Sequence, residues 1–395
     1  MLDFDTLAAK YTSKEDQQVP GVQAKCVDKN GKELYSKLVG FNGPSPDAGP
    51  LRADAAFKIG SATKLITSIA LLQCVDKGLI TLDDPITGLL PELDGKPIVT
   101  GMDLSMIPSN TKITARQLLT HTSGIPYGFL HPFVIKWRTT PEGLEFKNSR
   151  LTHERFNVPL VFEPGTGWMY GGSLDWAGVA VRRLHDNIPL EEYMIENIWK
   201  RVGRTSPFPT FNLGLRDEDY QAKLMQAAQR DAQGRLQPFE FEFGHNPVDA
   251  EGGSGMVATA DDFLAVLADL VSDSPKLLKP ETISDMFSPQ LQKGSKSTEM
   301  LVQLRPAWDN VAGPVASETV NHGLGGVLIQ GEAAELGQPA NLLGWGGALN
   351  TIWFASKELG VACFFSTQVS PFGDSKAREL IDAWKKEFWA QFKAT

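Results

Sequence analysis

The sequence predicts an α+β protein in which an antiparallel sheet, flanked by helices and built from both chain ends, carries an all-helical lobe. Short strand-like runs broken by glycine and turn residues occur at 22–41 and again at 323–367. Helical patterns and proline-broken loops, without clear period-2 alternation, fill residues 86–250. An apolar helix that opens with a serine and a lysine joins the two regions at 57–84. We expect the functional site beside this helix, in the cleft between the lobes.

The N-terminal part of the chain predicts a helix followed by a β-hairpin. Apolar residues recur at helical spacing over residues 2–11. Two runs of β character then flank the turn 29–32, which contains Asn30 and Gly31. Asn-Gly between such runs is a specific hairpin signal, because both residues tolerate the positive φ that the turn requires. The sheet is therefore expected to begin with this hairpin.

The central helix is predicted over residues 65–75, where apolar side chains cover most of its surface and Gly78 marks its end. Ser61 is expected at its N-terminus, where free backbone N–H groups favour negative charge. Lys64 follows at i+3 on the same face, so its amine can reach the serine hydroxyl. A buried lysine amine in this position can act as the base that a nucleophilic serine needs. The alternative is an N-cap serine followed by a surface lysine.

The rest of the chain divides into helices and a second group of strands. Helical spacing predicts helices at 113–119, 174–184, 190–200, 261–271, 280–286 and 375–392. Strand runs are predicted at 323–330, 341–346, 350–355 and 361–367. We therefore expect residues 1–85 and 245–395 to form a sheet lobe and residues 86–244 to form a mainly helical lobe.

Composition limits the partners. The net charge is −9 and 22% of the 395 residues are charged, which argues against binding to nucleic acid or to an anionic membrane surface. Cys26, Cys74 and Cys363 are far apart, so they are expected as core thiols in a reducing compartment. No signal peptide pattern is visible, and a cytoplasmic location is expected. No metal-binding spacing occurs, and neither a metal nor a cofactor is expected.

Several short motifs occur in a fixed order: GSATK, LITLDDPI, ITARQLLTHTSG, PGTGWMYG, GGSGM and GWGG, at residues 60–64, 79–86, 113–124, 164–171, 252–256 and 344–347. In this order the chain resembles the serine β-lactamase and penicillin-binding-protein superfamily, in its class C and family VIII esterase branch. Within that branch, YGFLHPF at 127–133 and WMYGGSLDWAG at 168–178 resemble the fungal lovastatin-type acyltransferases. The resemblance implies a β-lactamase-like fold.

The resemblance implies that Ser61, Lys64 and Tyr170 are the catalytic residues and that the backbone N–H groups of Ser61 and Ala348 hold the oxyanion. Local sequence alone favours a half-buried turn tyrosine at Tyr170, and it is the ordered set of motifs that favours catalysis. The family's Tyr-x-Asn motif lacks its asparagine here, since Gly172 stands in that place. We expect that any hydrogen-bonding task of this asparagine is either lost or carried out by Ser173.

A second departure concerns the substrate. Where the family has Lys-Thr-Gly, this chain has Trp345, Gly346 and Gly347, so the cation that serves the carboxylate of penicillins is missing. An aromatic ring in its place suits an apolar or ester-bearing substrate, and β-lactam hydrolysis is not expected. Tyr127 and Phe129 are expected to line the cleft, or else to belong to the core.

The resemblance implies acyl transfer through a Ser61 acyl-enzyme. The expected donor is an ester or a thioester, with a carrier protein or coenzyme A as its thiol, and the expected acceptor is a hydroxyl of a secondary metabolite. The alternatives are a family VIII carboxylesterase that hydrolyses small esters, a β-lactamase, and a non-catalytic binding protein.

Overall fold

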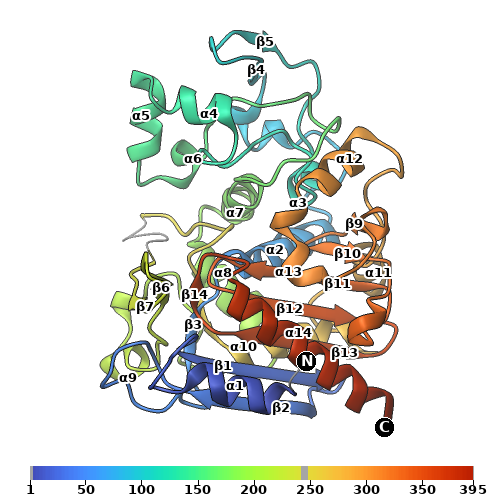
Figure 1. The fold of residues 1–395 in the computed structure, drawn as a ribbon. Coiled ribbons are helices and arrows are strands. Elements are labelled where there is room, and N and C mark those ends of the chain that lie inside the picture. Colours follow the sequence, from blue (N-terminus) through green and yellow to red (C-terminus); the bar gives the residue numbers. More distant parts are fainter. Residues whose placement is uncertain (1–2, 242–247, 395) are drawn as a thin grey trace.

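The computed structural model describes residues 3–241 and 248–394, and its centre is a seven-stranded antiparallel sheet (Figure 1). The strand order is β2-β1-β13-β12-β11-β10-β9. The strands are β1 Gly21–Asp28, β2 Glu33–Gly40, β9 Val320–His322, β10 Val327–Ile329, β11 Leu342–Gly347, β12 Thr351–Ser356 and β13 Val361–Ser366. Because β1 pairs with β13, strands from the two ends of the chain are neighbours in one sheet, as predicted.

The predicted N-terminal hairpin is confirmed. β1 and β2 pair in antiparallel register from Gly21 opposite Gly40, with a bulge after Cys26. Gly31 in the turn has a φ of +78°, a value that favours glycine.

Helices cover both faces of the sheet because successive strand residues point to opposite sides. On one face, Phe263 of α10 (Ala260–Val271) packs against Phe364 with ring centroids 5.6 Å apart. On the other face, Trp384 of α14 (Ser375–Ala394) packs against Phe365 at 5.3 Å. Helix α1 (Phe4–Thr12) lies beside α14. Phe364 and Phe365 thus point to opposite faces of the sheet, and each packs against the helix that covers its face.

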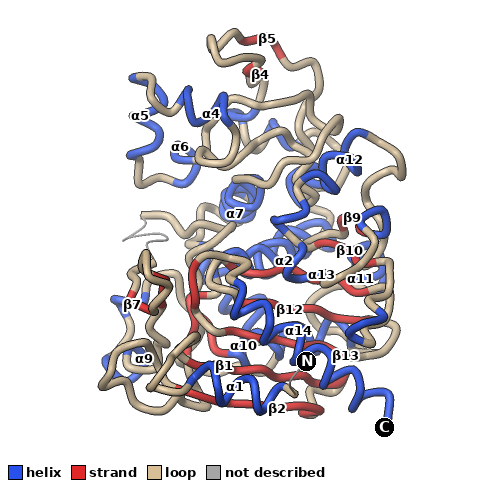
Figure 2. The backbone as a smooth tube through the Cα atoms, viewed as in Figure 1, coloured by secondary structure: helices blue, strands red, loops and turns tan. Residues whose placement is uncertain are grey.

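The predicted central helix is α2 (Thr63–Asp76), which follows a 3-10 turn at Gly60–Ala62. It is buried along nearly its whole length, as expected, and Lys64 is only 2% exposed. The helix ends at Asp76, and Gly78 follows its C-cap with a φ of +71°. It packs against α7 (Ser173–Arg183) on the side away from the sheet (Figure 2).

The remaining helices gather mainly on the far side of α7 and around the sheet edge (Figure 1). They are α3 Ala115–Leu119, α4 Pro132–Trp137, α5 Pro141–Asn148, α6 Thr152–Arg155, α8 Leu190–Met194 with a π-helical continuation Ile195–Trp199, α9 Glu218–Gln221, α11 Pro280–Met286, α12 Lys296–Gln303 and α13 Asp309–Ala312. Further 3-10 turns are Ile86–Gly88, Pro91–Leu93, Leu213–Leu215, Arg305–Ala307, Ser317–Thr319 and Ala334–Leu336.

Several short strands were not predicted. They are β3 Ala56–Lys58, which pairs with β8 Val257–Thr259, β4 Pro97–Val99, which pairs with β5 Met106–Pro108, and β6 Ala228–Arg230, which pairs with β7 Leu236–Pro238. A three-residue strand is too short to show an alternating pattern. The predicted strand 323–330 is shorter than expected. Its first four residues, which include Gly325, lie between β9 and β10, and only β10 is a strand.

β6 also pairs in parallel with β14 (Val369–Ser370) at the other end of the chain. A segment of the expected helical lobe thus pairs with a segment of the expected sheet lobe. The expected boundary between residues 244 and 245 lies outside the described residues. Cys26, Cys74 and Cys363 are free and buried, as expected for core thiols. Across residues 3–241 and 248–394, no helix combines the length and the apolar character needed to cross a membrane.

Candidate active site

The three predicted catalytic side chains meet at Ser61. The Tyr170 hydroxyl donates a hydrogen bond to Ser61 Oγ at 2.5 Å, and Lys64 Nζ lies 3.4 Å from the same oxygen. Ser61 sits in the 3-10 turn that leads into α2, and Tyr170 lies in the loop directly before α7. The packing of α7 on α2 therefore brings the tyrosine to the serine.

Lys64 Nζ has three hydrogen-bond partners. Besides Ser61, it donates to the Tyr127 hydroxyl oxygen and to the Gly253 carbonyl oxygen, both at 2.7 Å. An ammonium group has three N–H donors, so these partners use all of them. The nitrogen also lies 4.6 Å from the centre of the Tyr170 ring. Within the described part of the chain, Lys64 makes no direct ion pair with a carboxylate.

Tyr127 is a partner of Lys64, whereas the sequence predicted only a cleft-lining side chain. It is 7% exposed, and burial together with the neighbouring Asp175 carboxylate raises its pKa well above 10. Phe129 is 64% exposed and stacks on the Tyr127 ring, with centroids 5.3 Å apart. Only the outer residue of this aromatic pair is thus widely open to solvent.

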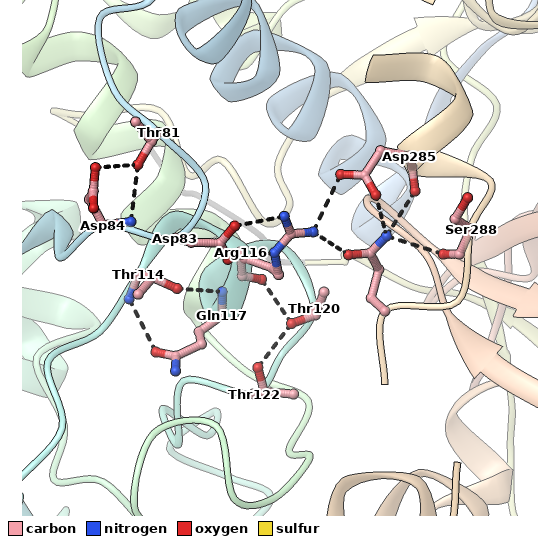
Figure 3. Close-up of polar contacts among 11 residues, drawn as sticks. Thr81, Asp83, Asp84, Thr114, Arg116, Gln117, Thr120, Thr122, Asp285 and Ser288 are labelled. Carbon is pink, nitrogen blue, oxygen red and sulfur yellow. Dashed lines mark hydrogen bonds and ion pairs between the residues drawn. The ribbon is translucent and has the colours of Figure 1, made fainter. Parts of the chain in front are cut away.

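Polar contacts tie α3 to its neighbours, eight residues before Tyr127 in the chain (Figure 3). Arg116 makes a bidentate ion pair with Asp83 at 2.7 and 2.9 Å and reaches Asp285 at 3.3 Å. Thr114 and Gln117 form a capping box at the start of the same helix. The two motifs at 79–86 and 113–124 are therefore joined to each other and to α11, and they hold the segment that runs on to Tyr127.

His121, which lies in the motif at 113–124, is buried beside Tyr170. It packs edge-on against Tyr170 at 5.0 Å and against His322 at 5.8 Å. Burial and the neighbouring His322 lower its pKa well below 6.5, so the ring is neutral. Its Nδ1 is buried and has no hydrogen-bond partner among the described residues. The loop bonds at this position come from the backbone, where the His121 carbonyl accepts the N–H of Met169 at 2.9 Å.

The end of β11 approaches Ser61 closely. A Cβ on Gly347 would lie 2.1 Å from the Ile59 carbonyl oxygen, so only glycine fits there. The next nitrogen, that of Ala348, lies 3.2 Å from the Cβ position of Gly60. The structure thus places the Ala348 backbone beside the residue that precedes the serine.

Three other predicted pocket residues are buried. Trp345 packs against Tyr170 with ring centroids 5.3 Å apart and forms a wall behind it. Gly346 is enclosed within β11. Ser173 is fully buried at the start of α7, and its hydroxyl hydrogen-bonds to Ser123 at 2.8 Å. That contact links the start of α7 to the segment after α3, and a role for Ser173 in place of the missing asparagine stays a prediction.

A cavity of about 740 Å³ opens on the outer side of Tyr127. Its walls carry the apolar side chains of Phe129, Ile135, Leu144 and Phe156 and the cations Arg138, Lys147 and Arg155. Arg155 is paired with Glu251. Lys147 is exposed and has no ion-pair partner within the described residues. In a protein of net charge −9, this cavity is a local cationic site with apolar walls.

Two residues beside Lys64 were not found from the sequence. Asp175 lies in the first turn of α7 and accepts the Gly253 N–H at 2.9 Å, and the Gly253 carbonyl in turn accepts from Lys64. Gly253 belongs to the GGSGM motif, but the motif alone does not show which atoms matter. The signal for Asp175 was an acidic residue in the mostly apolar first part of this helix.

Known proteins similar to this chain include acyltransferases and esterases. The β-lactamase family model matches residues 4–383. The acyltransferase calJ of Penicillium decumbens is 53% identical, covering all of this chain and 99% of the relative. Monacolin J acid methylbutanoyltransferase of Aspergillus terreus is 31% identical over 96% of this chain and 93% of its own, and lovastatin esterase of Penicillium rubens is 32% identical over 95% and 96%.

A solved structure shows the same fold. The unliganded simvastatin synthase of Aspergillus terreus superimposes with a TM-score of 0.86 at 30% identity, covering 99% of this chain and 98% of that chain. The predicted fold and the predicted class of enzyme, an acyltransferase or esterase of the β-lactamase superfamily, are confirmed by these relatives. This chain belongs to the β-lactamase family.

Proposed function

We propose that this chain is a serine acyltransferase that moves a short acyl group from a thioester to a hydroxyl of a secondary metabolite. The observation that carries the proposal is the position of Ser61 Oγ, within hydrogen-bond reach of both Tyr170 and Lys64. A serine becomes nucleophilic when an adjacent group accepts its proton, and both neighbours can exchange one. The 53% identity to an acyltransferase over the whole chain supports transfer.

In the proposed first step, one member of the Lys64 and Tyr170 pair is unprotonated, and it takes the Ser61 proton while Ser61 Oγ attacks the thioester carbonyl. The N–H groups of Ser61 and Ala348 hold the oxyanion, which the closeness of β11 to residue 60 supports. The thiolate then leaves with a proton from the pair. Both groups contact Ser61 Oγ, so we assign the base role to the pair as a unit.

In the second step the acceptor hydroxyl gives its proton to the same pair and attacks the Ser61 ester. The new ester forms, and Ser61 recovers its proton. The cavity beside Tyr127 supports an apolar acceptor, because Phe129, Ile135 and Leu144 offer it an apolar wall. Lys147 at its edge favours an acceptor or donor that also bears a carboxylate or phosphate.

One relative's name specifies methylbutanoyl transfer to monacolin J acid, which is a short acyl group and an acid acceptor. We extend to this chain only that chemical class. The donor thiol is proposed to be coenzyme A or a carrier protein. Hydrolysis is the second candidate, because a relative of similar identity is named lovastatin esterase.

The test gives the purified protein a short-chain acyl-coenzyme A, with and without a panel of polycyclic alcohols that carry a carboxylate or lack it. Intact-mass spectrometry should show one acyl group on Ser61 and none on Ser61→Ala, whereas Ser68→Ala, on the same helix, should still be acylated. New ester products should appear only with alcohol present. Free acid as the only product, at a rate independent of every alcohol, would establish hydrolysis in place of transfer. No adduct on the folded wild type would refute both.

A further inference from the structure

A buried carboxylate lies behind the proposed base system. Asp175 occupies the third position of α7 and is fully buried. Its Oδ1 accepts the Gly253 N–H at 2.9 Å, and its Oδ2 lies 3.5 Å from the Tyr127 hydroxyl. Both partners are also direct partners of Lys64. Asp175 is thus one residue removed from the Lys64 ammonium along two separate connections.

The direction of these hydrogen bonds follows from the donors available. An ammonium group only donates, so the Tyr127 oxygen accepts from Lys64. The Tyr127 O–H must then be donated to another atom, and Asp175 Oδ2 is the acceptor beside it. Tyr127 therefore connects the cation to the carboxylate without direct contact between them. A Cβ on Gly253 would lie 2.4 Å from Asp175 Oδ2, so the close packing here requires glycine.

The chain contains a comparison that separates this arrangement from ordinary helix capping. Asp262 occupies the same third position in α10 and is also buried, but it completes a capping box with Thr259 and pairs with Arg204. In α7 the N-cap residue is Gly172, which has no side-chain cap. The hydrogen bonds of Asp175 lead away from its helix toward the Lys64 partners. The buried Asp175 carboxylate therefore contacts the partners of Lys64, although burying a charge costs desolvation energy.

We propose that Asp175 is a positioning residue of the acyl-transfer site, which holds Lys64 Nζ beside Ser61 through Tyr127 and Gly253 and supplies it with a buried negative charge. This inference rests on the proposed function of Ser61. The other groups that face the pair are Tyr170 and Glu251. Burial raises the pKa of Asp175 to about 7, while the Lys64 cation opposes the rise. Glu251 also raises it, although Glu251 is itself paired with Arg155.

The main test is Asp175→Asn, followed through the rate of Ser61 acylation by a fluorophosphonate or an acyl thioester. Asparagine does not titrate, so the acid limb of the acylation rate should shift away from the value of about 7 that the Asp175 carboxyl sets in the wild type. Loss of positioning should lower the maximal rate about 10- to 100-fold, with the thioester KM nearly unchanged. A purely structural role would lower the amount of folded protein without moving the pH limb.

Asp262→Asn is the matched control, and it should keep both the maximal rate and the pH profile. Tyr127→Phe removes the connection from the other side and tests the idea even if Asp175→Asn does not fold. Its rate should also fall, and in the double variant the two losses should not fully multiply, because both variants break the connection through Tyr127. Wild-type rates and pH profiles in both single variants would overturn the inference. If the wild type itself is not acylated at Ser61, the proposed function fails, which is a distinguishable result.

Discussion

The Tyr170 hydroxyl donates to Ser61 Oγ at 2.5 Å, although the two residues are 109 positions apart in the chain. The serine is fixed by the turn that opens α2, and the tyrosine is fixed by the loop that enters α7. Because α2 and α7 pack directly against each other, the proposed nucleophile and its proposed proton-exchanging partner are held by two helices in contact. Catalysis by this pair would therefore need little rearrangement before acylation.

The first prediction concerns Tyr170→Phe. The ring contacts with Trp345 and His121 remain, but the proton-transfer group is lost. We expect kcat to fall by about 10²- to 10⁴-fold while KM changes little. Steady-state and single-turnover kinetics measure both terms. The matched control is Tyr193→Phe, a buried tyrosine that donates to Gln73 at 3.1 Å and should retain activity. A change in KM alone would show that Tyr170 binds substrate and does not transfer a proton.

The second prediction concerns the free cation of the cavity. Lys147→Glu should raise KM about fivefold for acceptors or donors that bear a carboxylate or phosphate, because an exposed ion pair contributes up to about 1 kcal/mol. Neutral analogues should be unaffected. Lys136→Glu is the control, since Lys136 is exposed on α4 but does not line the cavity. Equal changes for charged and neutral substrates would exclude a charge-recognition role for Lys147.

The third prediction follows from the raised pKa of Asp175. Burial is the main cause of its rise from 3.8 to about 7. Between these values the native state binds the proton that the unfolded chain has released, so this group's contribution to stability is complete below pH 3.8 and is lost as the pH rises through 7. Asparagine does not titrate, so the Asp175→Asn variant does not lose stability in this way as the pH rises. Urea unfolding from pH 4 to 8 should therefore show the variant gaining stability relative to wild type as the pH rises. A pH-independent difference would contradict it.

The fourth prediction concerns Arg116, which joins the segment after α2 to α3 and α11 (Figure 3). Arg116→Ala should lower the free energy of unfolding by about 1–2 kcal/mol, since a bidentate, partly buried ion pair and its network are lost. Arg52 offers a comparison, because it forms a similar bidentate pair with Asp54 in a more exposed place. Arg52→Ala should cost no more than about 0.5 kcal/mol. Equal losses in urea unfolding would show that the Arg116 network adds nothing.

Much of the fold and part of the site were predictable because their signals are local. The pairing of Ser61 with Lys64 requires only helical spacing, and the burial of α2 follows from its nearly continuous apolar surface. The hairpin around Gly31 follows from turn chemistry in the same way. The order of the short motifs then predicted the family, and with it Tyr170, whose role no local pattern in the sequence assigns.

The tertiary structure alone decided which side chains surround Lys64 and which face solvent. Tyr127 and Phe129 are two residues apart and similar in character, yet the first is buried on Lys64 and the second is exposed at the cavity. Asp175 reaches the site only because α7 packs on α2 and Gly253 allows close approach. The local sequence thus determined the main helices and strands and the closeness of Lys64 to Ser61. Contacts between distant segments depend on packing, which no periodicity encodes, and they determined the rest of the site.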